Sequence, residues 1–227
     1  MEVSEAIYTF YIGGIALDIK PEAIIQIIIV LAVGILAWWS TKDLKCRPQG
    51  KKQIVVEYIY TTLMKLVDDN MGQQYRDVIP FIGTLAAFIL PMNLLGLVGI
   101  APITKNYSIA LTLGVISFFA IQIYAMKKLG VAHYFLGYGQ PMSFMLPLNI
   151  IERVMLPVSL SLRLFGNILA ASFIVELAYG ALSKIAWVAQ IGIPIPLNAY
   201  FDIFDGTIQM VIFVMLTMIN MKVVAEH

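Results

Sequence analysis

Long apolar runs without charges constrain this chain more than any other feature of its sequence. One run of 23 residues extends from Val78 to Ile100, and another of 20 residues extends from Tyr107 to Met126. About 20 consecutive apolar residues are enough for a helix to cross the hydrocarbon core of a bilayer. Both runs are therefore predicted to be membrane-spanning helices, and the chain to be an all-α integral membrane protein.

Three further apolar stretches raise the expected number of membrane helices to about five. They are Ala23 to Trp39, Pro141 to Gly180 and Ile185 to Met221. The first ends in two tryptophans, which suit a membrane interface. Hydrophobic residues make up 60% of the chain and charged residues only 13%, whereas a soluble domain carries about 25% charged residues. The composition therefore places the chain in a membrane.

The order of these stretches predicts a single membrane domain, residues 1–227. Its expected parts are an external N-terminus at 1–22, a first span at 23–39, an interfacial helix at 53–70, a helical hairpin at 78–126 and two long helices within 143–224. Forty helical residues would run about 60 Å against a core of about 30 Å. The fourth element is therefore either strongly oblique or divided in two, with Pro147 and Pro157 as candidate breaks. Pro194 and Pro196 are expected to end a loop, and the last helix to run from about Leu197 to Val224.

The predicted helix at 53–70 is amphipathic. Val55, Ile59 and Leu66 fall on one face at helical spacing, and Glu57 and Lys65 fall on another. It either lies in the membrane interface or packs on a partner, and nothing in its sequence specifies a partner.

The basic residues predict the orientation. With the N-terminus outside, three basic residues are external, namely Lys20, Lys105 and Lys184. Ten are then internal, namely Lys42, Lys45, Arg47, Lys51, Lys52, Lys65, Arg76, Lys127, Lys128 and Lys222. Basic residues gather on the cytoplasmic side of membrane proteins. The N-terminus is therefore expected outside and the C-terminus in the cytoplasm.

Several classes of function are excluded or disfavoured. The net charge of +1 gives no sign of nucleic-acid binding. Cys46 is the only cysteine, so an internal disulfide and a cysteine-based metal cluster are excluded. The chain has no GxxxxGK[ST] phosphate loop and is not expected to split ATP by itself. Neither a cofactor nor a metal ion is expected.

Polar side chains gather in the last two long helices. Arg163 stays charged and costs about 2.5 to 3.5 kcal/mol in hydrocarbon, so such a residue typically marks an ion path or a charged partner. Its own helix also carries Asn149, Glu152, Asn167, Ser172 and Glu176, and the last helix carries Asp202, Asp205, Gln209 and Asn220. Two such stripes can enclose a watered path whose carboxylates carry protons or bind a cation. The alternative is that Glu152, Asp202 and Asp205 are merely solvated near helix ends.

The run Pro157-Val158-Ser159-Leu160-Ser161-Leu162-Arg163-Leu164-Phe165-Gly166-Asn167 resembles the most specific motif of the subunit a family of F-type ATP synthases. Further likenesses are Pro48-Gln49-Gly50, Asn93-Leu94-Leu95-Gly96-Leu97 and Gly206-Thr207-Ile208-Gln209. The resemblance covers nearly the whole chain. It implies a stator of a rotary motor, with Arg163 facing a rotor ring of small hairpin subunits and with Asn167 and Gln209 beside it. The implied outer half-channel also contains Ser172, Glu176, Asp202 and Asp205, and the inner one opens near Asn149 and Glu152.

The resemblance also implies partners and a location, and the sequence departs from the family pattern at two positions. The partners are the rotor ring, the peripheral-stalk subunit b, the rest of the ATP synthase and lipid, in the plasma (inner) membrane of a bacterium. Some members of the family carry a glutamate at Ser172 and a histidine at Asp202. The sequence leaves open whether the ion is a proton or sodium. A self-contained transporter and a purely structural anchor remain competing classes, although no internal repeat supports the first.

Overall fold

The computed structural model describes residues 8–12, 15–19, 21–42, 44–45, 50–100, 102–131, 134, 146–183 and 194–226. The expectations placed on Lys20, Cys46, Arg47, Pro48-Gln49, Pro141 and Lys184 lie outside these residues. The chain groups into two compact units, Met1–Thr62 and Leu63–His227. Five of the described helical segments are long and apolar enough to cross a membrane, which confirms the predicted number.

The first unit begins with a β-hairpin that the sequence analysis did not predict. Strand β1 (Tyr8–Ile12) pairs antiparallel with β2 (Ile15–Ile19), with Ile12 opposite Ile15. The expectation of an all-α protein therefore holds for the membrane helices but not for this part of the predicted external segment. The sequence of β2 suits a strand, because large apolar residues alternate with Ala and Asp in residues 15–19.

Helix α1 (Pro21–Thr41) is the first membrane span, slightly longer than the predicted 23–39. Most of its side chains are exposed within the chain and only Ile29 is buried; Leu36, for example, is 61% exposed. Such an apolar surface is stable only against lipid or another protein. At its end, the Lys52 ammonium lies 3.1 Å from the centre of the Trp39 ring, a cation–π contact typical of a membrane boundary.

Helix α2 (Lys51–Asn70) confirms the helix expected at 53–70 and continues from the first unit into the second. Two residues after its end lies Gly72, whose φ of +104° favours glycine. Val55 and Ile59 of the predicted apolar face are exposed, so that face is free to meet lipid or a partner. In the second unit Val67 is fully buried. The interfacial placement of α2 stays a prediction.

The predicted hairpin at 78–126 consists of two helices joined by short 3₁₀ turns. After η1 (Gln73–Val78) come α3 (Ile79–Asn93), η2 (Leu94–Val98), η3 (Ile103–Lys105) and α4 (Tyr107–Leu129). Asn106 caps α4 by accepting a hydrogen bond from the Ser108 amide. Gly99, with φ of +80°, ends η2. These turns bring η2 beside the C-terminal part of the chain, where the candidate site lies.

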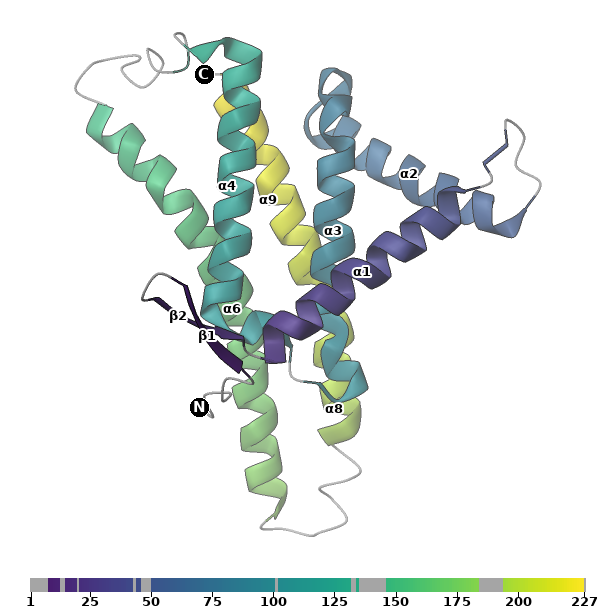
Figure 1. Cartoon of the computed structure of the whole chain (residues 1–227), viewed down its shortest axis with the longest axis vertical. Coiled ribbons are helices and arrows are strands. Elements are labelled where there is room, and N and C mark those ends of the chain that lie inside the picture. The colour runs from purple at the N-terminus through teal and green to yellow at the C-terminus, as the bar shows by residue number, and fades with distance from the viewer. Residues whose placement is uncertain are drawn as a thin grey trace. The chain divides into compact units, whose positions relative to one another are not determined.

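Helix α6 (Leu146–Ser183) is one continuous helix of 38 residues that crosses α4 obliquely (Figure 1). Of the two expectations for this element, the oblique helix is right and the division is wrong. Pro147 lies in the first turn, where its missing N–H costs nothing. Pro157 lies inside α6, and its carbonyl oxygen approaches Gly114 of α4 so closely that a Cβ there would stand 2.7 Å away. The two helices therefore make a tight backbone contact at Gly114.

The C-terminal segment is helical from Pro194. It consists of α8 (Pro194–Tyr200), the π-helix η5 (Phe201–Asp205) and α9 (Gly206–Glu226), and it runs antiparallel to α6 (Figure 1). The expectation that Pro194 and Pro196 end a loop is wrong, because prolines are tolerated in the first turn of a helix. The predicted last helix, about Leu197 to Val224, is otherwise close. Helix α9 packs against α3 and α4 around Ile82, Ile121, Phe213, Val214 and Met218.

Candidate functional site

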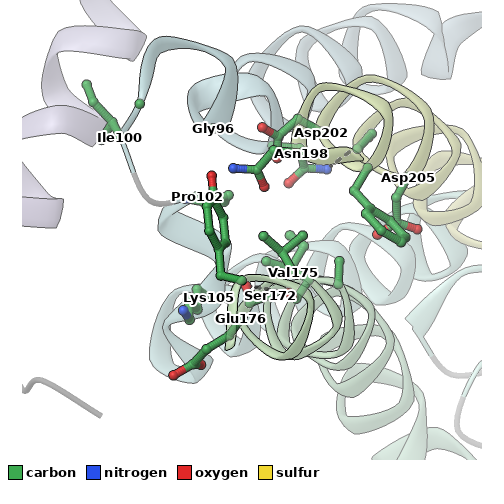
Figure 2. A pocket seen from close by; sticks show the side chains of 17 residues that line it. Gly96, Ile100, Pro102, Lys105, Ser172, Val175, Glu176, Asn198, Asp202 and Asp205 are labelled. Carbon is green, nitrogen blue, oxygen red and sulfur yellow. Dashed lines mark hydrogen bonds between the residues drawn. The ribbon is translucent and has the colours of Figure 1, made fainter. Parts of the chain in front are cut away.

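A cavity of about 410 Å³ lies between α6, η2 and the C-terminal segment (Figure 2). Its polar lining consists of Asn93, Lys105, Ser172, Glu176, Asn198, Asp202 and Asp205. The structure therefore brings together four residues that the sequence analysis assigned to one path: Ser172, Glu176, Asp202 and Asp205. The cavity is open to the surface and suits water and a small cation. Among the described residues, no cluster of three or more histidine, cysteine or acidic side chains is arranged to hold a metal ion.

Asp202 and Asp205 lie on the π-helix η5 and are half-buried. A π-helix is rare, and such turns are frequent at functional sites. Neither carboxyl group makes a hydrogen bond or ion pair with a residue that the structure describes. Both are therefore available to water or to a passing ion. The Asp202 carboxyl lies directly against Gly96 of η2.

Ser172 and Glu176 line the opposite wall of the cavity, on α6. The Ser172 hydroxyl donates to the Ile168 carbonyl at 2.8 Å, so it can offer the cavity only its oxygen as an acceptor. Glu176 is exposed, and in Figure 2 its carboxyl points away from Asp202 and Asp205. Its position fits the mouth of the cavity better than the interior.

Asn167 and Gln209 connect the two long helices. The Asn167 side-chain amide donates to Gln209 Oε1 at 2.6 Å, joining α6 to α9. Gln209 is fully buried, and its Nε2 has no hydrogen-bond partner. Asn167 itself is exposed on the side of α6 that carries Arg163. The pair therefore forms a fixed polar contact beside the arginine rather than in the wall of the cavity.

Arg163 lies on an exposed face of α6, next to Leu162, which is 51% exposed. A neighbouring face of the same turns is packed inside the chain, with Leu160 and Leu164 buried. Arg163 forms no hydrogen bond or ion pair with any part of the chain that the structure describes. A charged side chain on an apolar helix face is rare in membrane proteins and marks a candidate functional site.

Asn149 and Glu152 lie near the start of α6, at the opposite end from the cavity, and are not brought together with Asp202. Glu152 is exposed and Asn149 half-buried. Beside them Arg153 donates at 3.3 Å to the side-chain oxygen Oε1 of Gln122, which also accepts from the Tyr134 hydroxyl. Gln122 is 6% exposed and was missed by the sequence analysis, although a glutamine in a charge-free span was a usable signal.

Asn93 is a second residue that sequence reasoning did not single out for chemistry. It is 2% exposed, and its amide donates at 3.1 Å to the carbonyl of Gly206. The side-chain oxygen Oδ1 of Asn93 accepts a hydrogen bond from the Thr104 hydroxyl at 3.1 Å. A Cβ at Gly206 would stand 3.2 Å from the Cβ of Asn93. This buried network fixes η3 and the start of α9 to the end of α3, and so holds one wall of the cavity in place.

Comparison with known proteins assigns the sequence to a family. The family described as ATP synthase A chain matches residues 23–222. ATP synthase subunit a of Staphylococcus carnosus is 32% identical over 100% of both chains. The subunit a of Moorella thermoacetica is 33% identical, over 92% of this chain and 91% of its own. A protein of Propionigenium modestum, "ATP synthase subunit a, sodium ion specific", is 31% identical over 81% of this chain and 66% of its own. The chain belongs to the ATP synthase A chain family, the subunit a of F-type ATP synthases.

Proposed function

We propose that this chain provides two offset half-channels that carry protons or sodium to and from the carboxyl groups of a rotor ring. As a subunit a it is a membrane-sector stator subunit of the ATP synthase, involved in ion translocation, and a multi-pass protein with bacterial relatives. The finer proposal rests on two features of α6: Arg163 has no hydrogen bond or ion pair with a described residue, and the same helix lines a polar cavity.

The cavity is the proposed outer half-channel. Its carboxyl groups, Asp202 and Asp205, face Ser172 across it, while Glu176 stands at its mouth. Carboxylates in a watered intramembrane path attract cations and pass protons. Asn167 and Gln209 then extend the polar surface from this cavity toward Arg163, because their hydrogen bond joins the two helices at that level.

Arg163 is the proposed point of ion release. A cation within about 4 to 6 Å lowers the pKa of a carboxyl group by about 1 to 3, so a loaded ring carboxyl gives up its ion there. A charged carboxylate does not cross lipid readily, so the ring turns only in its loaded, neutral form. The fixed positive charge also repels cations and blocks a direct leak between the half-channels. Each charge that crosses 100 mV supplies about 2.3 kcal/mol, so several ions are needed for each ATP.

The inner half-channel is proposed to open near Asn149 and Glu152, at the other end of α6. The exposed side chain of Glu152 suits a cytoplasmic mouth. This assignment follows the proposed orientation, with the N-terminus outside and the C-terminus in the cytoplasm of a bacterium. The proposed partners are the rotor ring and the peripheral-stalk subunit b.

The test is ATP synthesis in vesicles that contain the whole complex with Arg163→Ala. We expect assembly and ATP hydrolysis to persist and ion-driven synthesis to be lost. Arg76→Ala is the matched control, because Arg76 is a half-exposed arginine that pairs with Asp68 of its own chain. Normal ion-driven ATP synthesis by the Arg163→Ala complex would contradict the proposed role of Arg163 in ion release. Repeating the hydrolysis assay with and without sodium identifies the ion.

A further inference from the structure

A position without a side chain faces the carboxyl group of Asp202. A Cβ built on Gly96 would overlap Oδ1, Oδ2 and Cγ of Asp202, because all three atoms lie closer than 3.0 Å to its position. Carbon atoms in contact normally stand about 3.5 to 4.0 Å apart. Figure 2 shows the two residues next to each other at the wall of the cavity. The carboxyl group of Asp202 therefore occupies the space that any larger residue at position 96 would fill.

The backbone conformation does not require a glycine at position 96. Among the described residues only Gly72, Gly99 and Gly130 have a positive φ, so the backbone of Gly96 accepts alanine without strain. The nearby Gly99 shows the opposite case, because its φ is +80° and nothing lies within 4 Å of its would-be Cβ. At Gly96 the nearest obstacle to a side chain is the carboxyl group of Asp202.

Packing rather than hydrogen bonding sets where the Asp202 carboxyl lies. It has no hydrogen-bond or ion-pair partner among the described residues, while η5 packs on η2. The three atoms nearest to the would-be Cβ all belong to the end of the Asp202 side chain. A methyl group at position 96 thus turns that side chain away, and the helices need not separate.

We infer that Gly96 is a positioning residue for outer ion access: its missing side chain lets the Asp202 carboxyl lie against η2 in the cavity wall. The functional part of this inference rests on the proposed role of Asp202. The space at position 96 and the acid at position 202 form one site, so a carboxyl group carried by residue 96 can occupy the same place when residue 202 is shortened.

The experiment compares four variants in the whole ATP synthase in vesicles: Gly96→Ala, Asp202→Ala, the double variant, and Gly96→Asp with Asp202→Ala. The readouts are ion-driven ATP synthesis and its dependence on the pH of the ion-entry side. Gly34→Ala is the control, because it adds a Cβ within a membrane helix where nothing lies within 4 Å. We expect Gly96→Ala to reduce synthesis by about the same factor as Asp202→Ala and to change the pH profile in the same way. The double variant should be no worse than either single change, and the exchanged carboxyl should restore part of the rate.

Two results overturn the inference in distinguishable ways. If the losses of Gly96→Ala and Asp202→Ala multiply in the double variant, Gly96 acts independently of Asp202, and the positioning role is wrong while the half-channel stands. If Asp202→Ala leaves both the rate and the pH profile unchanged, the proposed role of Asp202 in the half-channel is wrong. Assembly of each complex, measured by the yield of purified ATP synthase, separates these results from misfolding.

Discussion

The side-chain amide of Asn167 donates a 2.6 Å hydrogen bond to Gln209, and this bond joins the helix that carries Arg163 to the last helix of the chain. Gln209 is fully buried, so the bond lies partly in an apolar interior, where an unpaired amide is expensive. The two helices that would line the ion path are thus held in register at the level of the arginine.

Loss of this bond is expected to weaken the contact between α6 and α9. Hydrogen bonds between membrane helices contribute about 0.6 kcal/mol on average, and a buried group left unpaired costs about 1 to 3 kcal/mol. Asn167→Ala should therefore destabilise the subunit more than Asn167→Ala combined with Gln209→Leu. A double-mutant cycle on the thermal midpoint of the purified complex measures the coupling. Strict additivity of the two single changes would contradict a stabilising bond.

The crossing of α4 and α6 depends on Gly114. A Cβ at this position would stand 2.7 Å from the carbonyl oxygen of Pro157, a backbone atom that cannot rotate away. Gly114→Ala should force the helices apart at a cost of about 1 to 3 kcal/mol, the usual range for overpacking. The measurement is the yield and thermal midpoint of assembled complex. Gly34→Ala serves as the comparison and should leave both values unchanged, since its Cβ meets nothing within 4 Å.

The ion pair of Asp68 and Arg76 predicts a pH dependence outside the membrane helices. Two hydrogen bonds of 2.9 and 2.6 Å from the Arg76 guanidinium hold the pKa of the Asp68 carboxyl below its ordinary value, and the guanidinium charge acts in the same direction. A lowered folded-state pKa gives stability that is present above the unfolded pKa, about 3.9, and lost as the pH falls through the folded value. The effect is small, because the Arg76 side chain is 45% exposed and water screens its charge.

Asp68→Asn should consequently lower the thermal midpoint slightly at pH 7, and by progressively less as the pH falls below the unfolded pKa of about 3.9. The scan is done on the purified complex at low salt, where surface ion pairs are least screened. Asp69→Asn is the matched control, because Asp69 is adjacent and forms no ion pair with a described residue. If the difference in thermal midpoint between wild type and Asp68→Asn grew as the pH fell, the predicted direction of the pH dependence would be wrong.

The membrane helices were predictable from sequence because a bilayer requires spanning helices to be about 20 residues long and apolar. Runs of that length without charges are visible directly in the sequence. The runs starting at Val78 and Tyr107 gave α3 and α4, with ends displaced by a few residues. The N-terminal hairpin was missed because the search for long apolar runs passes over five-residue strands. The helical start at Pro194 was missed because proline reads equally well as a loop end and as a first helical turn.

The candidate site was only partly predictable. Helical spacing placed Arg163 and Asn167 on one face, but one helix alone cannot tell which residue of another it meets. The bond from Asn167 to Gln209 and the contact of Asp202 with Gly96 both join segments far apart in sequence. The π-helix η5 could not be predicted either, because a π-turn has no distinct sequence pattern. Its wider turn nevertheless determines the directions in which Asp202 and Asp205 project.

The last prediction separates the charge of Arg163 from its shape. Arginine keeps its charge at any working pH and presents five donors in a planar fork, whereas lysine carries a compact ammonium group that loses its proton more readily when it is desolvated. Arg163 is exposed on its helix face without a partner in the described chain, so it is free to meet a carboxyl group of another subunit. Arg163→Lys should therefore assemble normally but support only a small fraction of wild-type ion-driven ATP synthesis, with a further decrease at alkaline pH as the ammonium deprotonates. The assay is ATP synthesis from pH 6 to about pH 9 in vesicles, with passive ion leak recorded in parallel. Wild-type rates across that range would mean that any positive charge suffices and that the fork of donors plays no part.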